Sequence, residues 1–131
     1  DFTKFIEGKM QGASFTAASM VTVTFHECNL QKTNFSKAQM LTSVFIGCQL
    51  EHAVFDEARM EKVVVNESVL GENSFFGATI LLSCFTSAKL KNIDFQGLDL
   101  SQCQFLESEI IACNFNKAQL LQGGFMQANL A

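Results

Sequence analysis

The chain has 131 residues and a formal net charge of −4, and 48% of its residues are hydrophobic, with 14 Phe but no Trp, Tyr or Pro. This length fits one domain, and nine basic residues against 13 acidic ones argue against direct nucleic-acid binding. No apolar segment could cross a bilayer, and no basic segment followed by an apolar one opens the chain, so we expect a soluble cytoplasmic protein without membrane contact.

Large apolar side chains occupy every fifth position from Phe5 to Leu130 without a change of phase. An α-helix turns about 100° per residue and would scatter them around its axis, and an extended strand would place alternate ones on opposite faces. A chain that takes a short extended step, turns a corner and repeats would point all of them at one axis. A fixed repeat of this kind predicts a solenoid with a five-residue unit. In chain order these central residues are Phe5, Met10, Phe15, Met20, Phe25, Leu30, Phe35, Met40, Phe45, Leu50, Phe55, Met60, Val65, Leu70, Phe75, Ile80, Phe85, Leu90, Phe95, Leu100, Phe105, Ile110, Phe115, Leu120, Phe125 and Leu130.

A column of small residues stands two positions before the central ones, at what we call the slot positions. In a close-packed interior a large side chain leaves room only for a small neighbour, so one of each per unit suits a narrow core. Val65 replaces a Phe and its slot partner Val63 is larger than usual, so the pair partly conserves volume. Ile93 and Leu98 break the rule. The small slot residues include Ala13, Ala18, Cys28, Ala38, Ser43, Cys48, Ala53, Ala58, Ala78, Ser83, Ala88, Ala118 and Ala128.

Units such as Ala38-Gln39-Met40 and Ala128-Asn129-Leu130 resemble the Ala-Asp/Asn-Leu-x-x consensus of the pentapeptide-repeat family, and the resemblance covers the whole chain. It implies an all-β fold, a right-handed quadrilateral parallel β-helix with four five-residue sides and twenty residues per coil. The domain 1–131 would then have about six and a half coils and a length of about 30 Å at a strand spacing of about 4.8 Å. In mid-chain the polar position departs from the consensus, because valine fills it at Val44, Val54, Val64 and Val69.

Four sides and a ten-residue alternation would place Phe on two opposite sides and Leu, Met or Ile on the other two. Each coil would then stack like residues on like, and 12 of the 14 Phe would lie in two columns. The register is already running at Phe5 and continues to Leu130, so neither end shows a polar cap. We therefore expect the domain to be part of a longer chain or to lack its caps, and end-to-end association stays open.

Four of the five cysteines, Cys28, Cys48, Cys103 and Cys113, occupy slot positions, and Cys84 stands one place away. Their odd number and inward positions indicate reduced thiols that act as small apolar core residues. Cys28 and Cys48 would be neighbours in successive coils, which leaves a disulfide or a pair of metal-binding thiols open. Two thiols without a third ligand do not make a metal site.

The sequence offers few candidate catalytic residues. The two histidines, His26 and His52, fall on different predicted sides, and the unbroken register leaves no insertion for an active-site loop. There is no glycine-rich phosphate loop and no nucleophile elbow. We predict no catalytic residues, no metal or cofactor site, and no enzymatic activity.

Two patterns point outward. The first is an acidic belt, which carries the whole net charge within a stretch about one coil wide and is either a solvated stripe or a recognition site. It consists of Glu51, Asp56, Glu57, Glu61, Glu67 and Glu72, against Arg59 and Lys62. The second is an aliphatic pattern just after the central residues on two adjacent predicted sides, which is either an interface or a reflection of strand propensity. Its residues are Ile6, Ile46, Leu106 and Met126 on one side and Val21, Leu41, Leu81 and Leu121 on the other.

These patterns favour a non-enzymatic rigid solenoid that acts as a structural or protein-interaction module, one domain of a larger bacterial protein, with a protein partner or a neighbouring domain. The family resemblance supplies an alternative, a DNA-mimicking regulator that binds DNA gyrase as the quinolone-resistance members do. The modest charge and the lack of interrupting loops count against it. The family does not decide between a cytoplasmic scaffold and a secreted effector domain that works in a host cell.

Overall fold

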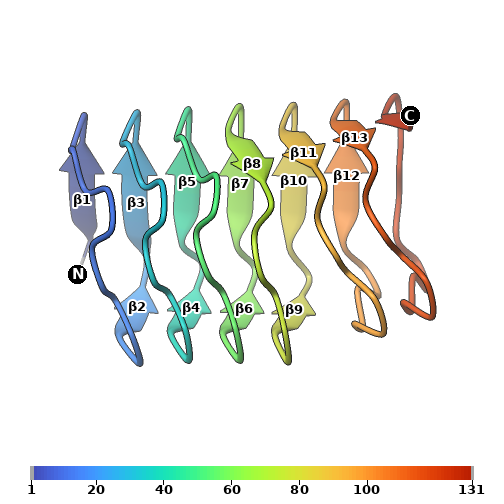
Figure 1. Cartoon of the computed structure of the whole chain (residues 1–131), viewed down its shortest axis with the longest axis horizontal. Coiled ribbons are helices and arrows are strands. Elements are labelled where there is room, and N and C mark those ends of the chain that lie inside the picture. The colour runs from blue at the N-terminus through green and yellow to red at the C-terminus, as the bar shows by residue number, and fades with distance from the viewer. Residues whose placement is uncertain (1, 131) are drawn as a thin grey trace.

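In the computed structural model, which describes residues 2–130, the chain forms a rod of stacked coils, and every regular element is a strand (Figure 1). The chain rises at the back of the view and descends at the front as it advances to the right, which makes the coil right-handed. Strands pair in parallel with residues twenty positions later, as Phe5 does with Phe25. The predicted right-handed parallel β-helix is confirmed, with about six turns where about six and a half were expected.

The rod has four sides, which we number by their first central residues: Phe5 for side 1, Met10 for side 2, Phe15 for side 3 and Met20 for side 4. Side 1 forms a six-stranded sheet of β1 (Thr3–Ile6), β3 (Val23–His26), β5 (Val44–Ile46), β7 (Val64–Asn66), β10 (Cys84–Thr86) and β12 (Gln104–Leu106). Side 4 forms a four-stranded sheet of β2 (Ser19–Val21), β4 (Gln39–Leu41), β6 (Arg59–Glu61) and β9 (Thr79–Leu81). Side 2 forms a four-stranded sheet of β8 (Val69–Gly71), β11 (Lys89–Lys91), β13 (Glu109–Ile111) and β14 (Asn129–Leu130). Side 3 is joined by isolated parallel bridges such as Asn34 with Val54.

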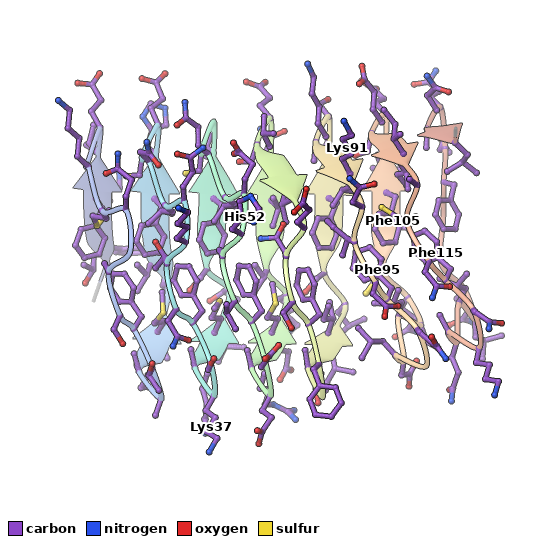
Figure 2. All side chains as sticks on the ribbon, viewed as in Figure 1. Lys37, His52, Lys91, Phe95, Phe105 and Phe115 are labelled. Carbon is purple, nitrogen blue, oxygen red and sulfur yellow. The ribbon has the colours of Figure 1, made fainter. Side chains whose placement is uncertain are left out.

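Two columns of phenylalanine fill the core from opposite sides, as predicted. Within a column the rings stack nearly parallel, with centroids 5.0 Å apart for Phe5 and Phe25. Between the columns the rings meet edge to face, as Phe105 does with Phe115 at 5.9 Å and 88°. Figure 2 shows Phe95, Phe105 and Phe115 pointing into the rod. Both arrangements are favourable for aromatic rings, so each Phe adds pairwise attraction to the area it buries.

Departures from the pattern are absorbed locally. Val65 interrupts the column of side 1, and both Val65 and Val63 are buried, at 2% and 0% exposure. Ile93 is also buried in its slot, and Leu98 packs partly buried against the core. Between these two slots lies Phe95, whose ring is tilted by 30° from that of Phe75, compared with 11° between Phe5 and Phe25. A larger slot residue is thus accommodated by a tilt of the ring beside it.

Slot residues also determine which hydrogen bonds form at the corners. At some corners the slot amide donates to the central carbonyl three residues earlier, as Ala38 does to Phe35 at 3.0 Å. At others a serine of the next coil replaces that bond: Ser43 Oγ accepts from the amide of Val23 at 3.2 Å and donates to the carbonyl of Met20 at 3.0 Å. The choice of Ala or Ser in the slot therefore follows the needs of a buried amide as well as space.

The fourth coil, with central residues Val65, Leu70, Phe75 and Ile80, is where strand structure changes sides. It holds β9, the last strand of the side 4 sheet, and β8, the first of the side 2 sheet. Its slot residue Asn73 is buried, and Asn73 Nδ2 donates to the carbonyls of Leu50 at 2.6 Å and Ala53 at 3.0 Å. An amide side chain thus bonds two carbonyls of the preceding corner at the point of change.

Every corner places a residue in the left-handed region. The residue two positions after each central one has a φ between 50° and 72°, and 21 of these corner residues are not glycine while four are. An L-residue in this region is disfavoured by roughly 1–2 kcal/mol. The coil hydrogen bonds and the packed core outweigh this cost at each corner. A substitution by glycine at a corner should therefore stabilise the protein, because glycine adopts a positive φ without this cost.

We therefore predict that Ser87→Gly stabilises the protein by up to about 1 kcal/mol, because Ser87 is an exposed corner residue with a φ of 50°. The measurement is the free energy of unfolding in urea. Ser87→Ala is the matched control, since it also removes the hydroxyl but keeps the Cβ, and it should give no gain. Equal stability of the two variants would contradict the corner argument.

Candidate interaction surfaces

The aliphatic residues identified in the sequence lie on the outward surfaces of sides 1 and 4, which meet along one corner of the rod. Val21, Leu41 and Leu121 on side 4 are 51%, 40% and 74% exposed. On side 1, Ile6 and Met126 are 64% and 70% exposed. Leu81, Ile46 and Leu106 are half-buried by their neighbours. The expected placement on two adjacent sides is therefore correct, and we call the eight residues together the aliphatic surface.

Polar residues divide this surface along the rod. On side 4, Leu41 pairs with Glu61, and Glu61 pairs with Leu81. On side 1, His26 lies between Ile6 and Ile46. The longest unbroken aliphatic contact between coils on side 4 is therefore Val21 with Leu41. The surface consists of aliphatic steps separated by single polar residues.

The coil arrangement leaves side chains as the means of contact on the sides. Backbone amides and carbonyls bond along the axis to the coils on either side, as Thr22 does to Leu41 at 2.9 Å and Gln39 does to Ala18 at 2.9 Å. A partner that docks against a side therefore meets few free backbone groups. Its affinity and specificity must come from outward side chains.

The acidic belt winds around the third and fourth coils as its positions in the repeat require, and most of its members are already engaged. Glu51 Oε2 accepts from Gln31 Nε2 at 2.7 Å. Asp56 Oδ1 accepts from the hydroxyl of Ser74 and from the amide of Phe76 at 3.0 Å.

Two further belt members have basic side chains as neighbours. Glu61 pairs with Arg59 at 3.2 Å, and Glu72 lies 3.8 Å from His52 Nδ1. These exposed contacts contribute little to stability. They show that the belt is in part an intramolecular network, so Glu57 and Glu67 are its members best able to meet a partner.

A second acidic feature was missed by reading the sequence in linear windows. The corner between sides 1 and 2 carries glutamate in four coils, and we call this row the acidic edge: Glu7, Glu27, Glu67 and Glu107. These residues stand at multiples of twenty positions from one another, so only a comparison at the length of one coil would have revealed them. Acidic side chains project from the upper edge of the rod in Figure 2.

Four cysteines belong to the core or pack against it, whereas Cys84 stands at an outward position of β10. All five are free thiols, and Cys28, Cys48 and Cys103 are buried. Cys48 Sγ donates to the carbonyl of Phe25 at 3.2 Å, and Cys28 Sγ donates to that of Phe5 at 3.1 Å. The two thiols that could have formed a bridge therefore serve, like Ser43, as slot donors to the preceding coil. Burial raises the pKa of the Cys48 thiol to about 11 and the pKa of the Cys103 thiol above its ordinary range.

The two histidines lie apart, as expected, with His26 on side 1 and His52 at the corner between sides 2 and 3. Within residues 2–130, no group of three or more His, Cys, Asp or Glu side chains is arranged to hold a metal ion. The same part of the chain contains no helix long and apolar enough to span a bilayer.

The geometry defines a class of protein, a right-handed parallel β-solenoid with four five-residue sides per coil. A family model described as pentapeptide repeats matches eight copies at residues 9–45 and 88–120, which together make up more than half of the chain. The chain belongs to the pentapeptide-repeat family. Members of this family are in general structural or interaction modules.

Solved structures of other pentapeptide-repeat proteins are similar in fold. A trypsin-treated R167E form of QnrB1, a plasmid-mediated fluoroquinolone resistance protein, is 20% identical with a TM-score of 0.59, over 98% of this chain and 77% of that one. HetL from the cyanobacterium Nostoc sp. strain PCC 7120, involved in heterocyst differentiation regulation, is 15% identical with a TM-score of 0.46, over 95% of this chain and 66% of that one. The chain thus spans just under two thirds of the length of HetL. No curated protein matches the sequence.

Because the Cys48 thiol is buried, we predict that the free energy of unfolding decreases in alkaline solution. In the unfolded chain it would lose its proton near its ordinary pKa of 9.0, whereas in the folded protein its pKa is about 11. The folded state therefore binds more protons than the unfolded state between these values, and stability falls as pH rises through that range, by roughly 1–3 kcal/mol. Urea unfolding at pH 8 and pH 10.5 should show a smaller loss for Cys48→Ala than for the wild type. Cys84→Ala is the control, and an equal loss in all three proteins would refute the assignment.

Proposed function

We propose that this protein is a non-enzymatic interaction module whose rigid rod presents the aliphatic surface of sides 1 and 4 to a protein partner or to a neighbouring domain of a larger bacterial protein. The observation that carries this proposal is the exposure of aliphatic side chains on two adjoining sides, where the fold accepts polar ones equally well. Thr86 and Ser101 occupy the same repeat positions in other coils.

The free energy available from burying the aliphatic surface supports a binding role for it. Removal of apolar area from water contributes about 25 cal/mol per Å², so burial of several exposed aliphatic side chains supplies a binding free energy of a few kcal/mol. The polar residues between them, Glu61 and His26, would fix the register of a partner along the rod, since a shifted partner would bury them without hydrogen bonds.

The test is a triple variant, Leu41→Ser, Leu81→Ser and Leu121→Ser. The core is not touched, so we expect an unchanged circular dichroism spectrum. Binding should fall by about 2 kcal/mol or more, which is roughly thirtyfold. The measurement is recovery of partners by the immobilised protein from a lysate of its source, quantified by mass spectrometry, followed by titration of the partner recovered.

The matched control changes the outward residues before the same central positions: Gln39→Ser, Thr79→Ser and Gln119→Ser. These residues are exposed on the same side of the rod and are polar already. The control should recover the partner like the wild type. Recovery that is the same for both triple variants would remove the aliphatic surface from the proposal.

A second candidate is a regulator whose acidic edge enters the basic groove of a nucleic-acid enzyme such as DNA gyrase. The row of glutamates along one corner is the observation that favours it. From Glu7 to Glu107 the edge spans five coils, about 24 Å, with four carboxylates. Duplex DNA carries one negative charge per about 1.7 Å, so the edge is several times less dense. This candidate therefore ranks second.

A supercoiling assay with purified DNA gyrase tests the second candidate. If the acidic edge binds the enzyme, micromolar protein should alter supercoiling, and the variant Glu27→Gln, Glu67→Gln, Glu107→Gln should lose the effect. The control is Asp94→Asn with Asp99→Asn, which removes negative charge elsewhere on the rod. No effect of the wild type, or equal effects of both variants, would exclude this candidate.

A further inference from the structure

Side 2 carries a hollow that lies outside the aliphatic surface and the acidic edge, and two members of the acidic belt, Glu51 and Glu72, line it. Its volume is about 270 Å³. It forms because the fourth coil carries small outward residues there: Gly71 has no side chain, and Val69 is short. Gly71 pairs with Lys91 of the next coil, and a Cβ placed on Gly71 would lie 3.7 Å from Glu51 Cγ of the preceding one. The hollow is a gap of one coil between two walls of long side chains.

The two walls carry opposite charges. The third coil supplies Glu51, and Glu72 follows Gly71 at the adjoining corner. The fifth coil supplies Lys89 and Lys91 on either side of one central residue. Beyond them, Glu109 of the sixth coil, which pairs with Lys89, also lines the hollow. Figure 2 shows His52 and Lys91 on the front of the rod, with strand β8 of Figure 1 between them.

These charges do not neutralise one another across the gap. Among the described residues the basic groups within 4.0 Å of a carboxylate oxygen are those of His52, beside Glu72, and Arg59, beside Glu61, so neither Lys89 nor Lys91 has such a partner. The third and fifth coils are two strand spacings apart, about 10 Å. A guest that carries both charges could meet the two walls at once.

Glu51 has a hydrogen-bonding capacity that the protein leaves unused. Its Oε2 is held by Gln31 Nε2 at 2.7 Å, whereas its Oε1 is buried and has no hydrogen-bond partner. A buried carboxylate oxygen without a partner is costly. A small rotation of this carboxylate toward the hollow would let an ammonium group of a guest supply the missing bond.

The floor of the hollow is apolar. It is formed by Val69 and Leu70 together with Leu90, and Ile111 lies at its far edge. Val69 and Ile111 are 37% and 38% exposed. Pockets for drug-sized ligands have volumes of about 300–1,000 Å³, so this hollow suits a smaller guest with an apolar part and two groups of opposite charge.

We propose that this hollow binds a free α-amino acid with an apolar side chain. The ammonium group faces Glu51 and Glu72, the carboxylate faces Lys89 and Lys91, and the side chain covers the floor above Gly71. The site lies on side 2 and shares no residue with the aliphatic surface, so it stands independently of the proposed function.

The test is an NMR titration of ¹⁵N-labelled protein with L-leucine. We expect chemical-shift changes confined to residues 51–52, residues 69–72 and strands β11 and β13, which line the hollow. N-acetyl-L-leucine lacks the positive charge and L-leucinamide lacks the negative one, so each should bind about two- to fivefold more weakly. An absence of shifts in these residues, or equal binding of all three compounds, would overturn the proposal.

Gly71→Val is the decisive variant, because it fills the hollow without straining the fold. The added Cβ meets only ordinary van der Waals contacts, at 3.7 Å, and Gly71 is a strand residue outside the left-handed region. Valine favours strands, so the melting temperature should stay the same or rise, while the response to L-leucine disappears. Unchanged binding by a folded Gly71→Val protein would sink the assignment.

Charge variants separate the two walls. Lys91→Gln should weaken L-leucine and N-acetyl-L-leucine but leave L-leucinamide unchanged, and Glu51→Gln should do the reverse for the two analogues. If Gly71→Val proves unstable, Gly71→Ala, with a smaller side chain, takes its place and should weaken L-leucine. The Leu41, Leu81, Leu121 triple variant is the control and should bind L-leucine like the wild type. A pattern opposite to this one would place the guest elsewhere or in another orientation.

Discussion

Backbone hydrogen bonding between coils is the constraint on which the rest of this structure depends. Each coil must lie one strand spacing from the next, and that spacing brings side chains at positions twenty apart into direct contact. Flat rings tolerate such stacking well, which is why Phe25 lies 5.1 Å from Phe45 with nearly parallel planes. A residue much smaller than those stacked on it would leave a gap unless a neighbour fills the space, as Val63 does beside Val65.

The same constraint separates the residues that build the rod from those free to vary. Central and slot residues face inward, and even the polar ones are committed: Ser108 Oγ donates to the carbonyl of Phe85 at 3.0 Å and accepts from the amide of Ala88 at 3.1 Å. Some outward residues also bond the backbone, as Asp94 Oδ1 does by accepting from the amide of Gln96 at 2.9 Å, but others make no such bond. Lys89, Thr79 and Gly71 occupy outward strand positions at no evident cost to the coil. Any binding by this protein must therefore depend on its outward side chains.

The core was predictable because its signal is repeated in every unit, so single exceptions such as Val65 did not hide it. The two adjacent aliphatic rows followed from the same register. The acidic edge was not found, because Glu7 and Glu27 are neighbours only at the length of one coil. The hollow over Gly71 was out of reach for a different reason. It depends on which long side chains flank a missing one in the coils before and after, and on where they point.

Several irregularities fall together in the fourth coil. Val65 breaks a ring column, Asn73 keeps a buried carbonyl oxygen without a partner, and strand structure passes from side 4 to side 2. In a solenoid each coil contacts only its neighbours, so cooperative unfolding depends on the interface between each coil and the next. The sheet of side 1 and the rings of side 3 continue through the fourth coil, so the two halves of the rod stay connected there. The fourth coil is nevertheless the least regular part of the rod, and we expect local unfolding to cross it more slowly than it crosses the coils on either side.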